Sequence, residues 1–106
     1  MATPEDFRRI ALSFAGAEER AHMAHPDFRV GGKIFATLGS PDAAHGMVQL
    51  MPEQQALAIE AEPAAFRAAS GAWGRGGSTL VRLEAVSHEW LERTLEWAWR
   101  KRAPTK

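Results

Sequence analysis

The sequence of 106 residues contains no cysteine. It therefore has no disulfide framework, no thiolate metal ligand and no cysteine nucleophile, which fits a reducing compartment. It also lacks an excess of either charge, because 13 basic and 13 acidic side chains cancel to a formal net charge of zero. This balance argues against a strongly basic nucleic-acid binder and against an acidic protein that stores calcium or iron, and leaves only local patches of charge.

Long apolar runs are absent as well. No segment approaches the ~18 consecutive apolar residues of a membrane span, and the polar, acidic residues 1–6 are unlike a signal peptide. We therefore expect a cytoplasmic protein with no membrane partner, in the form of a monomer. The length fits one domain, residues 1–106, which can bury a core without disulfides or metals.

Helix signals stand at both ends of the chain. Thr3 can cap a helix that starts at Pro4, and Gly16 can end it, which predicts a helix over about residues 4–14. Ser87 can cap a second helix over about residues 88–102, whose apolar side is broad enough to cover a sheet. Its surface carries two pairs with the favourable i, i+4 spacing, Glu89–Arg93 and Glu96–Arg100. Residues 101–106 are expected to fray.

Between these helices the patterns favour strands, short helices and turns. Strands are predicted over residues 17–23, 27–30, 33–38, 46–50 and 78–83, and short helices over about 52–59 and 63–69. Residues 40–42 indicate a turn, and residues 71–77 a loop with four glycines and one tryptophan. This order predicts an α+β fold in which helices pack against an antiparallel sheet.

The turn at Gly31–Gly32 joins two strands in a hairpin, and the loop length decides which side chains share a face. A two-residue loop would place Phe28 and Val30 beside Lys33 and Phe35. A three-residue loop with a glycine bulge would align them with Ile34, Ala36 and Leu38. We favour the second because its apolar face is cleaner; the opposite face would then hold Arg29, Lys33, Phe35 and Thr37.

No residue pattern indicates an enzyme or a resident cofactor. His22 and His25 could bind one metal ion only if their segment formed a helix, and its pattern favours a strand and a turn. Asp27 and His45 could approach, but a metal needs three or four converging ligands, so we expect polar turn histidines and no metal site. The carboxylate pairs lack an apolar pocket and the serines lack a nucleophile elbow, so we assign no catalytic residue.

The glycine-rich segment at residues 73–79 leaves two interpretations open. Its backbone amides could approach a phosphate while Arg75 supplies charge, but its spacing is not that of a P-loop, which excludes an ATPase. The alternative is a tight loop that needs positive φ angles and is anchored by a buried Trp73.

Three basic residues flank the glycine-rich turns, where a nucleic-acid backbone could reach them: Arg29, Lys33 and Arg75. Such contacts would go to phosphates and give affinity with little sequence readout. The simpler alternative for each is a solvated charge on the open side of a strand.

Several segments together resemble the MmcQ/YjbR family: residues 25–36, 63–66, 71–83 and 98–100, with the layout of residues 7–19 also matching. The resemblance covers essentially the whole chain. It implies a sheet-and-helix architecture similar to CyaY and frataxin, and a DNA-binding label that rests on a double-wing arrangement of hairpins. By position the wings would be the Gly31–Gly32 turn and the Trp73–Ser78 loop. The resemblance then implies that Arg29, Lys33 and Arg75 contact DNA phosphates.

Two departures qualify what the resemblance implies. Some family members have an aromatic residue near the position of Ser78, so any stacking role of that residue is absent here. Iron binding by analogy with frataxin would need an acidic ridge on the first helix, whereas here Arg8 and Arg9 follow Glu5 and Asp6.

The leading hypothesis is therefore a non-enzymatic domain that binds DNA weakly through Arg29, Lys33 and Arg75. The alternative is a module for a protein partner or a small anionic ligand, using Trp73, Gly74, Gly76, Gly77 and Ser78. Exposure of Trp90 and Trp97 would indicate self-association instead.

Overall fold

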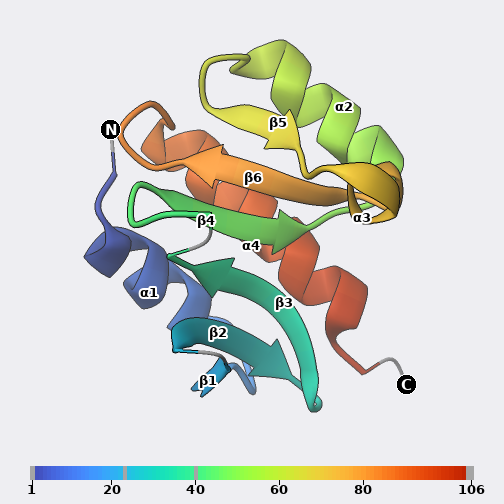
Figure 1. Ribbon diagram of the computed structural model, residues 1–106. Coiled ribbons are helices and arrows are strands. Elements are labelled where there is room, and N and C mark those ends of the chain that lie inside the picture. The colour runs from blue at the N-terminus through green and yellow to red at the C-terminus, as the bar shows by residue number, and fades with distance from the viewer. Residues whose placement is uncertain (1, 23, 40, 105–106) are drawn as a thin grey trace.

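The computed structural model describes residues 2–22, 24–39 and 41–104. Its centre is an antiparallel sheet of six strands in the order β1-β2-β3-β4-β6-β5 (Figure 1). The strands are β1 (Glu18–His22), β2 (His25–Val30), β3 (Lys33–Leu38), β4 (His45–Gln49), β5 (Phe66–Ala68) and β6 (Ser78–Arg82). The helices are α1 (Pro4–Leu12), α2 (Pro52–Ala61), α3 (Gly71–Arg75) and α4 (His88–Arg102). The predicted α+β class is confirmed.

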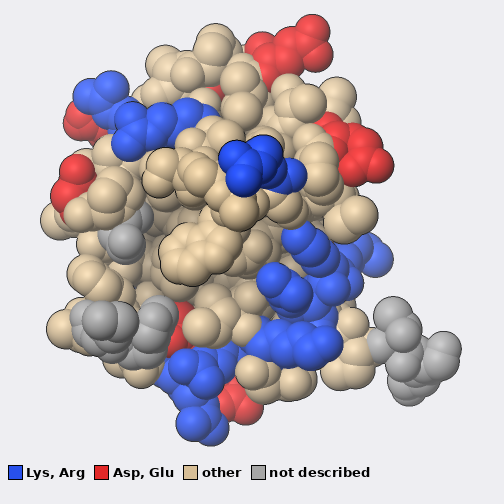
Figure 2. Space-filling view, turned by 45° about the vertical axis from the view of Figure 1, so that its right-hand side comes forward, with Lys and Arg blue, Asp and Glu red and all other residues tan. Residues whose placement is uncertain are grey.

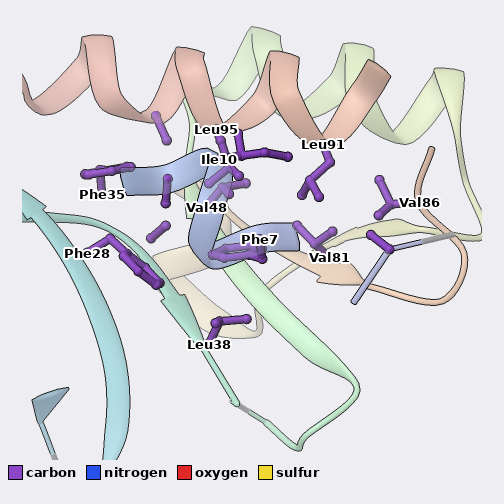
Figure 3. Packing of buried hydrophobic residues seen from close by; sticks show 14 of the residues in the cluster. Phe7, Ile10, Phe28, Phe35, Leu38, Val48, Val81, Val86, Leu91 and Leu95 are labelled. Atoms are coloured by element: carbon purple, nitrogen blue, oxygen red, sulfur yellow. The ribbon is translucent and has the colours of Figure 1, made fainter. Parts of the chain in front are cut away.

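Helices α1 and α4 cover one face of the sheet, and the core lies between them and the strands (Figure 3). Its largest fully buried side chains are apolar and come from both layers: Phe7, Phe28, Phe35, Phe66, Leu50, Leu91, Leu95, Val48, Val81 and Val86. Burial of this apolar surface on one side of the sheet stabilises the fold and leaves the other side, the open face, without a covering layer.

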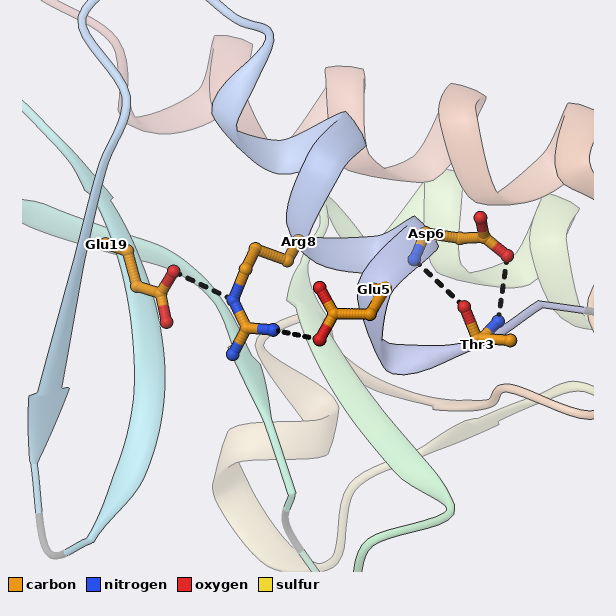
Figure 4. A network of polar contacts seen from close by, with 5 residues as sticks. All are labelled: Thr3, Glu5, Asp6, Arg8 and Glu19. Carbon is orange, nitrogen blue, oxygen red and sulfur yellow. Dashed lines mark hydrogen bonds and ion pairs between the residues drawn. The ribbon is translucent and has the colours of Figure 1, made fainter.

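The start of α1 is fixed by a capping box (Figure 4). The Thr3 hydroxyl oxygen accepts from the Asp6 backbone N–H at 3.1 Å, and the Thr3 N–H donates to the Asp6 carboxylate at 3.0 Å. These hydrogen bonds, led by the one from the Thr3 backbone, lower the pKa of Asp6. Arg8 then bridges Glu5 and Glu19, which ties α1 to β1. The helix ends two residues earlier than predicted, with Ser13 as its C-cap.

Helix α4 has the predicted bounds. The Ser87 hydroxyl oxygen accepts from the Trp90 N–H at 3.2 Å, and the two expected ion pairs form at 3.3 Å (Arg93–Glu89) and 2.6 Å (Arg100–Glu96). The prediction of a frayed tail is wrong for residues 101–103, because Lys101 and Arg102 are helical and partly buried and Ala103 packs against the core. Residues 105–106 lie outside the described ones.

The β2–β3 hairpin combines parts of both predicted registers. Gly31 and Gly32 form a two-residue turn at φ angles of 59° and 80°, with Val30 opposite Lys33, so the predicted three-residue loop is wrong. The register then shifts: Arg29 pairs with Ile34, but Phe28 pairs with Ala36, which leaves Phe35 as the extra residue of a bulge.

This bulge redistributes the side chains of β3. Phe35 and Ala36 are both fully buried, whereas Phe35 was expected on the opposite face. Ile34, expected in the core, is only half-buried and shares the open face with Arg29. The burial of a second large ring explains why the bulge is favoured over an unbroken ladder.

Two further predictions are wrong in the segment before β6. Residues 63–69 are not a helix: a turn leads into β5, where Phe66 is buried, Arg67 is exposed and the strand pairs with β6. Residues 71–77 are not all loop, because they contain the short helix α3. In both cases tertiary pairing overrides the local signal of Pro63 and of the glycines.

The glycines around α3 are required by packing. A Cβ atom on Gly74 would overlap the carbonyl oxygen of Ala69, and one on Gly77 would overlap that of Leu50. Gly77 also has a φ angle of +112°. These contacts press α3 and the start of β6 against neighbouring backbone, so only glycine fits.

This packing gives a matched pair of variants. We expect Gly77→Ala to lower the free energy of unfolding by about 3 kcal/mol or more, because backbone strain and steric overlap add. Gly71 has a φ angle of +71° but open space around it, so Gly71→Ala should cost only about 1 kcal/mol. Urea denaturation of both variants measures the difference, and equal losses would contradict the packing argument.

Candidate functional site

The open face of the sheet contains a hollow of about 840 Å³, which we call the basic hollow. Its floor comes from half-buried side chains of β3, β4 and β6. Its walls are the β2–β3 turn, the segment that contains α3, and the last turn of α4. The residues that line it are Arg29, Gly32, Lys33, Ile34, Thr37, Pro41, Met47, Gln49, Ala69, Ser70, Ala72, Trp73, Gly76, Ser78, Leu80, Lys101 and Arg102. In Figure 2 this face is hollowed near its centre, with basic side chains gathered to the right of the hollow and below it.

The lining of the basic hollow is charged with one sign. Arg29, Lys33, Lys101 and Arg102 contribute to it, and among the described residues no aspartate or glutamate does. Arg29 is partly neutralised, because its Nε and Nη2 donate to the two carboxylate oxygens of buried Asp27 at 2.8 and 3.2 Å. Hydrogen bonding to Asp27 is also the main reason why the pKa of Arg29 is raised.

The other cations of the hollow are not neutralised in this way. Among the described residues, the basic side chains with no carboxylate within 4.0 Å are Lys33, Arg67, Arg75, Lys101 and Arg102. Three of these line the hollow, and Arg75 ends the helix that forms one of its walls. The protein has no net charge, yet its uncompensated positive charge is concentrated here.

The last turn of α4 brings two of these cations to the end of β4. Lys101 Nζ donates to the carbonyl of Leu50 at 2.8 Å. Burial lowers the pKa of Lys101, and the adjacent charge of Arg102 acts in the same direction. Arg102 Nε is buried without a hydrogen-bond partner among the described residues. A bound anion would compensate this crowded positive charge.

Trp73 is 78% exposed at the wall of the hollow, so the interpretation of this residue as a buried anchor is wrong. Helix α3 is fixed by the residue that follows Trp73, because Gly74 is pressed against the backbone of Ala69. The side-chain amide of Gln55 adds hydrogen bonds of 3.1 Å to the carbonyls of Gly74 and Ser78 and to the Thr79 hydroxyl. A rigid support therefore holds an aromatic ring in solvent.

The predicted site residues are only partly brought together. Arg29, Lys33, Trp73, Gly76 and Ser78 line the basic hollow, whereas Arg75, Gly74 and Gly77 do not. Gly74 and Gly77 are buried and serve the packing of α3. The Ser78 hydroxyl donates to Gln49 Oε1 at 3.1 Å.

Sequence reasoning missed Lys101 and Arg102. The signal was present, since the predicted helix reached residue 102 and ends in the consecutive basic residues 100–102. The general tendency of chain termini to fray argues against this signal, but here residues 101 and 102 are helical.

The remaining candidates do not form a site within the part of the chain that the structure describes. There, no group of three or more His, Cys, Asp or Glu side chains could hold a metal ion. The His22 side chain lies outside the described residues, and His45 is hydrogen-bonded to Asp42 at 2.8 Å, which lowers the pKa of Asp42. Trp90 and Trp97 are half-buried and pack edge to face at 6.0 Å between ring centroids.

Of the described helices, none has the length and apolar character needed to cross a membrane.

Comparison with known proteins gives a family and a fold. A family model described as YjbR matches residues 12–101. No curated protein matches the chain. Among solved structures, the crystal structure of Deinococcus radiodurans protein DR2400, which carries a DUF419 domain, is similar with a TM-score of 0.76 and 17% sequence identity. The match covers 93% of this chain and 77% of that one, and at this identity it establishes the fold alone.

The environment of Lys101 makes a prediction about proton binding. Because its pKa is lowered in the folded state, the unfolding free energy should rise as the pH increases from that lowered pKa to the ordinary lysine value. Heteronuclear NMR of the lysine side chains, with Lys101→Arg to assign the signal, should show Lys101 titrating below the usual range. Titration at or above that range would contradict the burial of this ammonium group.

Proposed function

Because this chain belongs to the YjbR family, we propose that it is a non-enzymatic binding protein whose ligand is DNA, held weakly through the phosphate backbone. The observation that supports this function is the one-signed lining of the basic hollow. Four cationic side chains from β2, β3 and α4 converge there, and within the described part of the chain no aspartate or glutamate lines the hollow. Backbone phosphates are the ligand groups that such an arrangement attracts.

The assignment of contacts differs from the one that sequence patterns alone suggest. Lys33 keeps its proposed role, since it lines the hollow and has no carboxylate partner in the part of the chain that the structure describes. Arg29 contributes less because it shares its charge with Asp27. Lys101 and Arg102 take the place of Arg75 as the principal additional phosphate contacts, and Arg75 acts at the edge of the site.

The charge balance of the protein sets the expected strength of binding. Many other basic side chains are paired with carboxylates, as in Arg8 with Glu5 and Glu19, or Arg100 with Glu96. Only about three or four phosphates can therefore be neutralised, and such contacts release few counterions. The affinity should be modest, and it should fall with salt concentration less steeply than that of a protein with many phosphate contacts.

A second candidate function is supported by the size of the hollow. A volume of about 840 Å³ lies within the range of roughly 300–1,000 Å³ that is usual for small-molecule sites. A free anionic ligand could occupy it, with Trp73 as an apolar wall. Binding of such a ligand would not depend on the length of a nucleic-acid chain, and this separates the two functions.

The proposed function predicts charge-dependent binding of labelled DNA in a fluorescence anisotropy titration. Lys33→Gln and Arg102→Gln should each weaken binding several-fold at low salt. Each should also reduce the slope of log K against log salt by roughly 0.7–0.9, the value for one lost phosphate contact.

Arg93→Gln is the matched control, because it removes the same charge from an exposed position of α4 that does not line the hollow. It should leave affinity and slope near those of the unmodified protein. No binding at about 100 µM protein in low salt, near the weak end of non-specific affinities, would refute the proposal. Equal effects of all three substitutions would refute the role of the hollow.

A further inference from the structure

We propose that the basic hollow takes an unpaired strand of DNA, with a base stacked on Trp73 and adjacent phosphates near Lys33, Lys101 and Arg102. This inference rests on the proposed function and specifies the form of nucleic acid that is bound. It combines two chemistries that line one hollow: an exposed aromatic ring and uncompensated positive charge.

The exposed ring favours an unpaired strand over a duplex. In a duplex the flat faces of the bases are stacked on one another, and a protein reaches mainly their edges in the grooves. In a single strand the base faces are accessible, and stacking on aromatic side chains supplies much of the affinity. The Trp73 side chain, 78% exposed beside the hollow, offers such a stacking surface.

The shape of the site points the same way. Recognition of a duplex groove usually requires a helix or a β-ribbon that projects into it. Here Lys33, Lys101 and Arg102 line a concavity, and the β2–β3 turn does not stand free, because a Cβ atom on Gly31 would lie 3.0 Å from the Pro104 ring. The segment of residues 73–78 holds the end of α3 rather than a second projecting hairpin.

The floor of the hollow suits a nucleotide base. Ile34, Met47 and Leu80 provide apolar surface for the base. Gln49 and Thr37 place hydrogen-bonding groups on the same floor, and the Gln49 side-chain oxygen is held by the Ser78 hydroxyl. A base can therefore meet both an apolar surface and polar groups while its phosphates meet the cations.

The support of Trp73 lowers the cost of stacking. Helix α3 is held by the close approach of Gly74 to Ala69 and by the Gln55 hydrogen bonds. Little backbone order then has to be gained on binding, so more of the stacking energy is available for affinity.

The test compares three probes on the full chain: a single-stranded oligodeoxynucleotide, the duplex of the same sequence, and deoxythymidine monophosphate. We expect the single strand to bind more tightly than the duplex, and the mononucleotide to bind far more weakly than either. Tryptophan fluorescence should be quenched by the strand, and this quenching should be lost in Trp73→Phe while the other tryptophans still fluoresce.

Two substitutions separate stacking from charge. Trp73→Ala should weaken binding of the single strand by about tenfold or more, the usual loss for one stacked base, and leave the salt slope unchanged. Leu57→Ala is the control, because it shortens another exposed apolar side chain that does not line the hollow. Circular dichroism should show both variants folded, since both side chains are exposed.

The outcomes distinguish this inference from the function on which it rests. Equal or tighter binding of the duplex, or an unchanged single-strand affinity in Trp73→Ala, would overturn the inference and leave DNA binding intact. Mononucleotide binding as tight as that of the strand would also overturn it, in favour of a small ligand. Absence of binding to both strand and duplex would overturn the proposed function itself.

Discussion

The bulge at Phe35 determines how the two faces of the sheet differ. By pairing Phe28 with Ala36 but Arg29 with Ile34, β3 sends two consecutive side chains into the core and reserves Ile34 and Thr37 for the open face. The apolar core between the sheet and helices α1 and α4 therefore forms on only one face of the sheet. On the turn side of this shift, Arg29 pairs with Ile34 and Lys33 follows the Gly31–Gly32 turn, and both line the hollow. The packing of β3 in the core and its contribution to the floor of the hollow therefore depend on one irregularity in one strand pair.

Local sequence signals predicted the elements whose ends are set by short-range hydrogen bonds. Thr3 and Ser87 mark helix starts because their hydroxyls accept from N–H groups three residues later. The local signals failed where contacts between residues far apart in the sequence determine the secondary structure. Phe66 becomes part of a strand because β6 offers it an edge and the core offers it a place, and α3 forms where Gly74 and Gly77 meet the carbonyls of Ala69 and Leu50. The site was predicted in part for the same reason: Arg29 and Lys33 flank a recognisable turn, but nothing local shows that Lys101 reaches the carbonyl of Leu50 across the fold.

Zero net charge conceals an uneven distribution. Ion pairs along α1, β1 and α4 compensate Arg8, Arg9, Arg20, Arg93 and Arg100. The cations that remain lie mainly around the hollow, where a ring and an apolar floor accompany them. A ligand that is both anionic and aromatic fits this combination better than a purely electrostatic or purely apolar one. Membership of the YjbR family agrees with the fold.

The edges of the sheet carry a consequence for how the protein behaves at high concentration. A six-stranded open sheet exposes unpaired backbone groups at both ends, and these invite pairing with further copies of the chain. At one end, β1 presents Glu18, Glu19 and Arg20 within five residues, so a second copy added in parallel register would place like charges opposite one another. At the other end, β5 has three residues and lies beside α2, which leaves little edge to extend. The charges on β1 and the shortness of β5 therefore disfavour the addition of further strands at either edge of the sheet.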